Sequence, residues 1–527
     1  MSLAPYLLRE DYWDSFELED DDLEFIYNHL LDLETPLTSQ ELLSALVKAR
    51  IQREQMAIEE QLSSGSDIYV PKGTYQTNQE LVFPAFNLRR GMVTATRAGQ
   101  NPDLGAFQVI QVKFDNGEFK EMAADLKDHI LNEPLDISSQ DPALDFGHVI
   151  ATHGDQLDER LQSTLNKDHN FVRIAGKWFP RALLVDINAG HLNLAEAILD
   201  MASGGPMPTT SLMEQVGLAE SSNPKLVEFS LDLALQEDTR FDEVGSAGEI
   251  LWFLHRLEPE AVLQPPAYLR YQEVEYDHNL LTDDMLALES KLGDELSPVS
   301  RKYPRVNEVQ VTLTYPHWCS GTLPLSEQMR HLFPTAYEAP RIRFTLVDGV
   351  SGQKFPAWVV RSHRYVFGLQ DWYKAKGLFP GSLVRVRHGK NPGEVIIQCD
   401  AQRGSREWIR TVLVGSDGGI VFAMLKQVVT ASYDERMAIA IPDPLALELA
   451  HKQMQKERTP FERTVVHTVR ELAKLNPQSH VHASELYAAV NVIRRCPPGP
   501  ILALLASRPW FVHVGDLHFR FDDSEKA

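Results

Sequence analysis

The residues best suited to chemistry in this chain are basic side chains that gather between positions 354 and 410. This stretch carries eleven Lys or Arg and four acidic residues, a balance of +7, whereas the whole chain of 527 residues has a formal net charge of −23. A basic island in an acidic chain is typical of a surface that neutralises phosphates. A solvated basic face that pairs with acidic modules of the same chain is the alternative, and both stay open.

A second set of residues could form a metal-dependent nuclease site. Pro102-Asp103 followed by Glu118-Phe119-Lys120 fits the loose pattern of such enzymes, which need two carboxylates to hold Mg²⁺ and a lysine beside the attacking water. Here Asp103 lies in an Asn-Pro-Asp turn, and Glu118 and Lys120 flank a second turn. We expect Glu118 and Lys120 to be an exposed pair, and a nuclease that uses Asp103, Glu118 and Lys120 is the less favoured alternative.

Other catalytic patterns are absent from the sequence. Its eighteen histidines form no HExxH pattern, and its three cysteines (Cys319, Cys399 and Cys496) form no CxxC, so we expect neither a metal site nor a disulfide framework. There is also no GxxxxGK[ST], GxGxxG or GxSxG motif. The sequence therefore predicts a protein without catalytic residues, metal ligands or cofactors.

Length and composition set limits on the class of protein. A chain of 527 residues with 43% hydrophobic residues should fold into about three to five domains. No apolar run approaches the ~18 residues of a membrane span, and the first residues do not resemble a secretory signal. We expect a cytoplasmic protein with no membrane contact. The acidic balance argues against tight, indiscriminate nucleic-acid binding and favours a focused, salt-sensitive patch.

The elements that must position the basic residues can be predicted from apolar alternation. Seven short strands are expected at about 309–315, 321–325, 341–347, 355–360, 365–367, 383–387 and 394–399. Two short helices are expected at 326–333 and 369–376. This order implies many non-local strand pairings and helices too short to cover a sheet. It indicates a small pseudobarrel with helices at its ends, with Trp358 and Trp372 in its core.

This segment resembles the B3-type DNA-binding pseudobarrel of plant transcription factors and of the effector domains of some restriction enzymes. The likeness covers under a fifth of the chain. It rests on Leu323-Pro-Leu325, Phe333-Pro334, Trp358, Tyr365-Val-Phe-Gly-Leu-Gln-Asp-Trp372 and Gly377-Leu-Phe-Pro-Gly381-Ser-Leu-Val-Arg-Val386. The family usually has Gly-Asp before the penultimate strand, where this chain has Gly381-Ser382.

The resemblance implies that two loops enter the major groove of double-stranded DNA. Arg recognises guanine through paired hydrogen bonds, and Ser or His can donate to or accept from base edges. The base-contacting residues implied for the two loops are His317, Trp318 and Ser320 in the first and Arg361, Ser362, His363 and Arg364 in the second. Four further cations would hold the phosphate backbone without sequence information. These are Lys374, Lys376, Arg385 and Arg387.

A second pattern recurs along the chain. Helices are predicted to begin near Pro36, with a capping box from Thr38 to Glu41, near Pro208, with a box from Ser211 to Glu214, and near His482, without a box. Short hairpins with glycine turns at Gly176, Gly245 and Gly515 follow helical stretches. This plan resembles the winged helix-turn-helix modules of RNA polymerase accessory subunits and restriction-enzyme accessories.

Local charge separates the copies of this pattern. Residues 206–257 carry nine acids and three bases, so this copy should avoid DNA and could bind a protein partner. Residues 458–522 carry eight bases and five acids. Arg494 and Arg495, with His513 on the hairpin, could reach phosphates or the minor groove.

We therefore predict an α+β multidomain chain with winged-helix modules, a small β-rich domain and a B3-like β-pseudobarrel. The expected parts are an acidic N-terminal segment (1–24), a helical HTH-like module (25–86), a small β-rich domain (87–135), a winged-helix-like region (136–257), an acidic linker (258–302), the pseudobarrel (303–402), a β-hairpin with a connecting helix (403–457) and a C-terminal winged helix (458–527).

The expected function is non-enzymatic DNA binding, in a transcription regulator or a component of a defence system. The alternative from another class is an acidic protein-interaction scaffold associated with transcription machinery. A single basic face that joins Arg361, Arg364, Arg385 and Arg387 would favour DNA, whereas acidic residues from neighbouring modules over that face would favour the scaffold.

Overall fold

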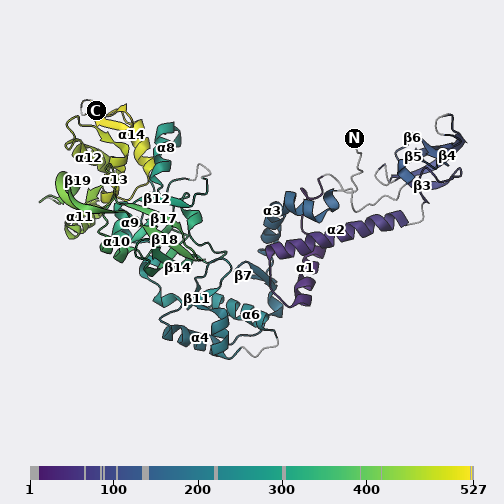
Figure 1. The fold of residues 1–527 in the computed structure, drawn as a ribbon, viewed down its shortest axis with the longest axis horizontal. Helices are drawn as coiled ribbons and strands as arrows, with labels where there is room; N and C mark the ends of the chain where they lie inside the picture. The colour runs from purple at the N-terminus through teal and green to yellow at the C-terminus, as the bar shows by residue number, and fades with distance from the viewer. Residues whose placement is uncertain are drawn as a thin grey trace. The chain divides into compact units, whose positions relative to one another are not determined.

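The structure is a computed structural model of the chain (Figure 1). It describes residues 11–63, 67–83, 86, 89–101, 105–132, 142–218, 223–298, 304–391, 393–416, 418–457, 459–522 and 524. The chain divides into two compact units, Met1–Asp186 with Ser221–Ser230, and Ile187–Glu220 with Leu231–Ala527. The fold is mixed α+β, as predicted.

The first unit contains a helical part with a small antiparallel sheet. Its elements are α1 (Asp20–Leu33), β1 (Leu37–Thr38), α2 (Ser39–Ser63), α3 (Phe146–Leu165), β7 (Phe171–Ile174) and β8 (Lys177–Pro180). The sheet order is β1-β8-β7. Leu42 and Leu46 of α2 and Leu161 of α3 are buried in its core, as expected for one apolar face of each helix.

The acidic N-terminal segment, predicted as residues 1–24, is partly helical. Asp20, Asp21 and Asp22 form the first turn of α1, where negative charge is favourable. Asp22 is buried, and its Oδ2 lies 2.5 Å from Nη2 of Arg50. Residues 1–10 lie outside the described part of the chain.

A five-stranded sheet is inserted between α2 and α3. Its strands are β2 (Asp67–Ile68), β3 (Glu80–Phe83), β4 (Arg89–Ala98), β5 (Gln108–Phe114) and β6 (Phe119–Ala124), in that order across the sheet. Leu81, Val93 and Ile110 are buried within it. The tight turn at Gly117 has a φ of 80°, which glycine adopts without strain, and joins β5 to β6.

The order helix, strand, helix, helix, strand, strand occurs three times along the chain. The first unit supplies one copy, with the five-stranded sheet as an insertion. The second copy is α4 (Ala189–Met201), β9 (Met207–Pro208), α5 (Thr209–Val216), α6 (Pro224–Glu237), β10 (Phe241–Glu243) and β11 (Leu251–Leu254). The third is α12 (Phe461–Ala473), β22 (Val481–His482), α13 (Ala483–Ile493), α14 (Pro498–Ser507), β23 (Phe511–Gly515) and β24 (His518–Phe521). In every copy the first short strand pairs antiparallel with the last strand.

The helix starts of these copies test the predicted capping boxes. The first is confirmed, because Glu41 N donates to Thr38 Oγ1 (3.3 Å) and Thr38 N donates to a Glu41 carboxylate oxygen (2.8 Å). The second is wrong, because α5 begins at Thr209 after Pro208, without a side-chain cap. The third copy has a box that the sequence did not predict, in which His482 and Glu485 cap each other's backbone.

The segment from 308 to 398 forms one curled, seven-stranded sheet. Its strands are β12 (Glu308–Thr312), β13 (Thr322–Pro324), β14 (Arg341–Asp348), β15 (Lys354–Val360), β16 (Tyr365–Phe367), β17 (Leu383–His388) and β18 (Glu394–Gln398). They lie in the order β12-β17-β18-β14-β15-β16-β13, and only the pairing of β14 with β18 is parallel. Trp358 and Trp372 are buried, as predicted.

Two of the connections in this sheet differ from prediction. The stretch 326–333 contains only a short 3₁₀ turn, η9 (Arg330–Leu332), in place of the expected helix. The expected loop 316–321 is the helix α9 (Tyr315–Ser320), which has Pro316 in its first turn and ends at Gly321 with a φ of 63°. The other helix, α10 (Gln370–Lys376), lies where it was predicted.

The stretch 258–298, which was predicted as an acidic linker, is folded and packed. It contains α7 (Glu260–Leu263), the 3₁₀ turns η7 (Ala267–Leu269) and η8 (His278–Leu280), and α8 (Asp283–Leu292). Leu269, Leu281, Met285 and Leu288 are buried. Its apolar residues therefore belong to the core of the second unit.

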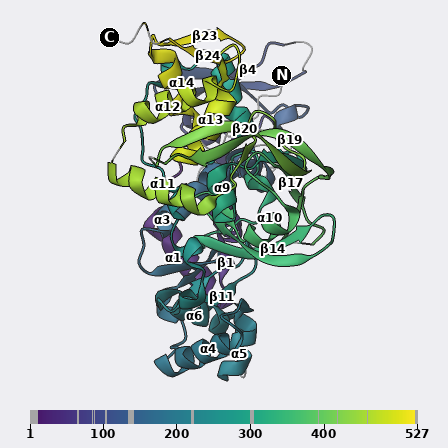
Figure 2. The same cartoon turned by 90° about the vertical axis from the view of Figure 1, so that its left-hand side faces the viewer.

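A long two-stranded ribbon follows the seven-stranded sheet (Figure 2). β19 (Ala401–Val414) pairs antiparallel with β20 (Ile420–Ala431), and β21 (Ile439–Ala440) adds to β19 before α11 (Pro444–Glu457). At one end of the ribbon, Leu383 N donates to Ser432 O (2.9 Å). At its other end, Val412, Ile420 and Phe422 enter the core of the third copy.

None of the helices in the described ranges has both the length and the apolar character needed to cross a bilayer.

Candidate nucleic-acid interface

The turn between β15 and β16 contains the predicted residues Arg361, Ser362, His363 and Arg364. All four are exposed. Arg361 Nη1 donates to Ala339 O (2.7 Å), and Arg364 Nη1 donates to Glu295 O (3.2 Å). The His363 ring is stacked on Tyr365, with ring centroids 6.3 Å apart. The second predicted loop is therefore at the surface, with its two guanidinium groups oriented by backbone carbonyls.

Strand register shows where a further predicted cation lies. β15 ends at Val360, opposite Arg341 at the start of β14. Arg387 on β17 is paired with Ile396 on β18, and Ile396 is paired with Val347 near the end of β14. Val347 in turn faces Lys354 at the start of β15. The exposed Arg387 is therefore level with the start of β15 and not with the 361–364 turn.

The first predicted loop does not present base-contacting side chains. His317 is only 2% exposed, with its Nδ1 2.9 Å from Thr322 Oγ1 and its Nε2 3.0 Å from Glu295 Oε2. Trp318 is half-buried and donates from Nε1 to Leu378 O (2.8 Å), and Ser320 Oγ is buried. The prediction for these three residues is wrong because the segment folds as α9, at the end of β13 opposite the 361–364 turn.

The predicted phosphate-binding cations divide into paired and exposed groups. Lys376 pairs with Asp348 (2.6 Å), and Arg385 pairs with Asp400 and lies 3.9 Å from Glu308. Lys374 and Arg387 are exposed, and neither has an acidic partner within ion-pair distance in the part of the chain that is described. A single basic face that includes Arg385 is therefore not formed.

An acidic residue of the second copy lies close to the basic turn. Burial raises the pKa of Glu243 to about 8, the neighbouring carboxylates of Glu338 and Asp232 add to this, and Arg361 opposes it. Backbone bonds hold the hairpin here, since Arg343 N donates to Val244 O (2.9 Å). With this pKa, Glu243 is largely protonated at pH 7 and does not neutralise Arg361.

The C-terminal copy places its two predicted arginines differently. The Arg495 side chain is 3% exposed, and its Nη2 lies 2.6 Å from Asp294 and 2.7 Å from Glu295. Arg495 therefore cannot reach phosphates, and that prediction is wrong. Arg494 is half-buried, with Nη2 3.2 Å from Gln272 Oε1, whereas His513 on β23 is exposed.

The buried acids around Arg495 also explain why His317 is inaccessible. Burial opposes ionisation of Glu295, but Arg495 and His317 outweigh it and hold the pKa of this carboxyl well below its usual range. Tyr487 Oη donates to Asp294 (2.6 Å). The cluster of Asp294, Glu295, His317, Tyr487 and Arg495 joins the packed 258–298 stretch, α9 and the third copy.

One group in the described residues has the donor set of a metal site, and sequence analysis missed it. Asp242, His255 and Glu258 bring three potential ligand atoms within 4.8 Å of one another. Arg341, however, pairs with Asp242 and lies 3.1 Å from Glu258 Oε2, and His255 Nδ1 lies 2.9 Å from Asp242. The guanidinium already supplies the counter-charge, so these contacts form an ion-pair network.

The residues of the nuclease alternative are only partly described. Glu118 and Lys120 form an exposed pair on the β5–β6 hairpin, with Nζ 3.5 Å from Oε1. This agrees with the expected solvated pair beside the turn. Asp103 lies outside the described residues.

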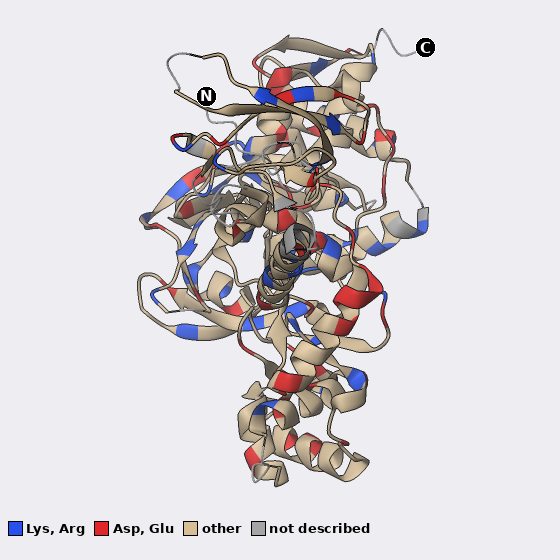
Figure 3. Cartoon of the chain, turned by 90° about the vertical axis from the view of Figure 1, so that its right-hand side faces the viewer, with Lys and Arg blue, Asp and Glu red and all other residues tan. Residues whose placement is uncertain are grey.

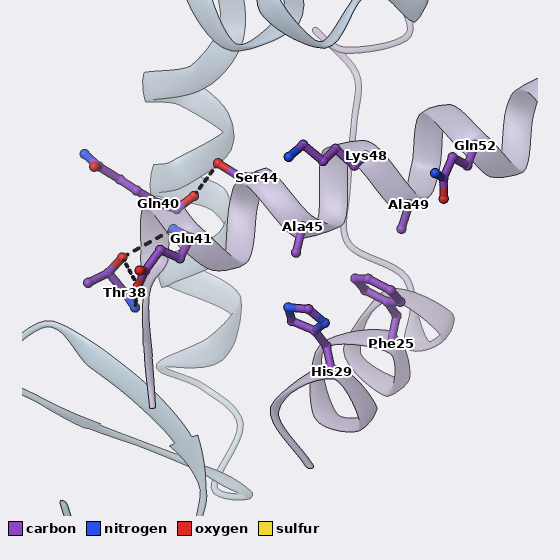
Figure 4. Close-up of a pocket in the computed structure, with 10 residues that line it drawn as sticks. All are labelled: Phe25, His29, Thr38, Gln40, Glu41, Ser44, Ala45, Lys48, Ala49 and Gln52. Carbon is purple, nitrogen blue, oxygen red and sulfur yellow. Dashed lines mark hydrogen bonds between the residues drawn. The ribbon is translucent and has the colours of Figure 1, made fainter. Parts of the chain in front are cut away.

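A groove lies between α1 and α2 in the first unit (Figure 4). Its volume is about 830 Å³. Phe25 and His29 of α1 face Ala45 and Ala49 of α2, and the remaining lining residues are Thr38, Gln40, Glu41, Ser44, Lys48 and Gln52. The Glu41 carboxylate is occupied by the backbone and side chain of Thr38, which lower its pKa. The groove contains no acid–base or nucleophile pair.

Comparison with known proteins found no matching family model, no matching curated protein and no matching solved structure. Lys and Arg are interspersed with Asp and Glu along the chain (Figure 3). The likeness to B3 domains and to winged helices therefore depends on residues and element order alone.

Proposed function

We propose that this protein is a non-enzymatic DNA-binding protein whose B3-like pseudobarrel contacts duplex DNA through the 361–364 turn and Arg387. The observation that carries this proposal is the exposed Arg361-Ser-His-Arg364 turn, in which backbone carbonyls orient both guanidinium groups. Arg361 and Arg364 would recognise guanine, Ser362 and His363 would contact base edges, and Arg387 would hold a phosphate.

The three helix-strand-helix-helix-strand-strand copies serve as winged helices in this proposal. The second copy, with its acidic excess, would bind a protein. The third, with its basic excess, would contact the DNA backbone through Arg494 and His513 and not through the buried Arg495. Such a protein would act in the cytoplasm as a transcription regulator or as the sequence-recognising component of a defence system.

The test is fluorescence-anisotropy binding of the full chain to random-sequence duplex DNA across a salt series. We expect binding that weakens steeply with salt, since phosphate contacts release counterions. The double variant Arg361→Ala/Arg364→Ala should bind more weakly and lower the salt slope by about 1.8, because on random-sequence duplex the two guanidinium groups act by neutralising phosphates.

The matched control removes two exposed lysines of the first unit, Lys72→Ala/Lys113→Ala, for the same change in net charge. It should bind like the wild type. Equal affinities of the two double variants would remove the 361–364 turn from the proposal, and no binding at low salt would remove DNA altogether.

A scaffold function is the second candidate, and α4 favours it. Leu194 and Met201 are 50% and 81% exposed, and they lie on the copy with the acidic excess. Exposed apolar side chains on one helix can form a protein-docking surface. If the duplex test fails, exchange of Leu194 and Met201 for serine, followed by measurement of partner capture, becomes the relevant experiment.

A further inference from the structure

We propose that the outer face of the β19–β20 ribbon binds a segment of single-stranded DNA by stacking an unpaired base on Trp408. This goes beyond the proposed duplex binding and rests on it only in the choice of DNA over RNA.

The ribbon holds Trp408 in an open position. Trp408 is 60% exposed, and its cross-strand partner Lys426 places Nζ 5.4 Å from the ring centroid. The neighbouring pair on the same face is Arg406 with Val428, and Val428 is 67% exposed. Residues directly opposite each other on paired strands share a face, so an aromatic ring, two cations and an aliphatic side chain are adjacent.

The opposite face of the ribbon is occupied by the protein itself. Ile409 and Val429 are buried with Ala438, and Phe379 and Tyr433 pack against them. Glu407, the only acidic residue in β19 or β20, alternates onto this inner face, where burial and then the Glu407 charge raise the pKa of Tyr433. The outer face therefore carries positive charge without an acidic residue of either strand.

Charge and shape together favour a nucleic-acid strand over a protein on this face. Two cations that flank an exposed indole match a phosphate on each side of a base, and aromatic stacking tolerates any base because each has a π face. Same-face positions along a strand are about 6.8 Å apart, which suits an extended backbone. Bases in a duplex are already stacked, so only unpaired DNA can use the ring.

The sheet edge leaves room for such a strand. β20 is the outermost strand of its three-stranded sheet. β20 has 12 residues, and Lys426 is its one charged residue. Exposed edge strands of this length are usually protected by several charges, by proline or by a covering element. A bound polyanion alongside it would satisfy the charge of Lys426 and Arg406.

The experiment measures binding of the full chain to fluorescein-labelled oligo(dT) of about 20 nucleotides, with a duplex hairpin and oligo(U) as parallel probes. We expect Trp408→Ala to weaken oligo(dT) binding about tenfold and to leave duplex affinity unchanged, and Trp408→Phe to retain most of the affinity. Arg406→Ala/Lys426→Ala should lower the salt slope for oligo(dT) by about 1.4, from two phosphate contacts.

The control is Tyr337→Ala, which removes another exposed aromatic side chain of the same unit and should change nothing. Unchanged oligo(dT) binding in Trp408→Ala would overturn the proposal. A Trp408→Ala variant that changes its oligomeric state, without a change in oligo(dT) binding, would also overturn it and would point to a protein–protein surface. If Arg361→Ala/Arg364→Ala loses duplex binding but keeps oligo(dT) binding, the duplex site and the Trp408 site are separate. If the protein binds oligo(U) more tightly than oligo(dT), the choice of DNA over RNA is contradicted.

Discussion

Glu243 shows how a single buried carboxyl can set the charge around the basic turn. Its pKa, raised to about 8 by burial and by Glu338 and Asp232, keeps it largely neutral beside Arg361 at pH 7. The folded state binds this proton more tightly than the unfolded state, whose pKa is near 4.5. The proton-linked stability is therefore complete below pH 4.5 and is lost as the pH rises toward 8.

Glu243→Gln should remove this pH dependence. We expect the free energy of unfolding of the wild type to fall relative to that of the variant between about pH 4.5 and 8. In this range the unfolded wild type releases the Glu243 proton, whereas the folded wild type retains it, and glutamine has no such proton. Urea unfolding at pH 5, 7 and 8.5 measures the difference. Parallel stability curves for the two proteins would contradict the assignment.

The misplacement of His317 and Arg495 has one physical cause. Residue type and local charge predicted both as DNA contacts, but their acidic partner Glu295 lies 22 and 200 positions away along the chain. Such pairings are decided by tertiary packing, which a single sequence does not show. The exposed Arg361–Arg364 turn was predictable because it lies between two short strands whose apolar alternation is local.

At the scale of elements, the helix cap at Thr38 gives a clean test. Thr38 Oγ1 accepts from Glu41 N and forms one half of a capping box (Figure 4). Thr38→Ala should lower the free energy of unfolding of the first unit by about 1 kcal/mol. Ser44→Ala on the same helix is the matched control, because Ser44 Oγ only donates back to Gln40 O, and it should change stability by less than about 0.5 kcal/mol. Thermal unfolding followed by circular dichroism compares them.

The strands of the seven-stranded sheet were predictable within about three residues, because buried and exposed positions alternate along them, as in β14. Two connections were not predictable from periodicity. Helix α9 is only six residues long, which is too short for a 3.6-residue repeat to be visible. Its ends do carry local signals, because Thr314 is at the N-cap, Pro316 is in the first turn and Gly321 follows the last turn. The stretch 326–333 has helix-like apolar spacing but forms mostly turns.

At the scale of the whole second unit, Arg495 is the residue whose loss should matter most for stability. Its guanidinium neutralises Asp294 and Glu295 in the interior. Arg495→Met would leave the buried Asp294 without a counter-charge and Glu295 with His317 alone, and should cost about 3–5 kcal/mol. Urea unfolding monitored by tryptophan fluorescence measures this loss.

The triple variant Arg495→Met/Asp294→Asn/Glu295→Gln is the control. It removes the unpaired charge and should recover a large part of the lost stability. A single variant as stable as the wild type would show that the cluster is solvated, in conflict with its burial.

The same buried cluster bears on how a DNA target would be arranged. Arg495 of the C-terminal copy bonds to Glu295, which also contacts His317 of α9 beside the seven-stranded sheet. Because these contacts fix the C-terminal copy to the sheet, the two surfaces proposed to face DNA would keep one separation. A duplex turns once in about 10.5 base pairs. The two DNA segments that these surfaces contact would therefore have to lie at a fixed rotation from each other around the duplex axis. A protein built in this way would measure the spacing between sites as strictly as it recognises their bases.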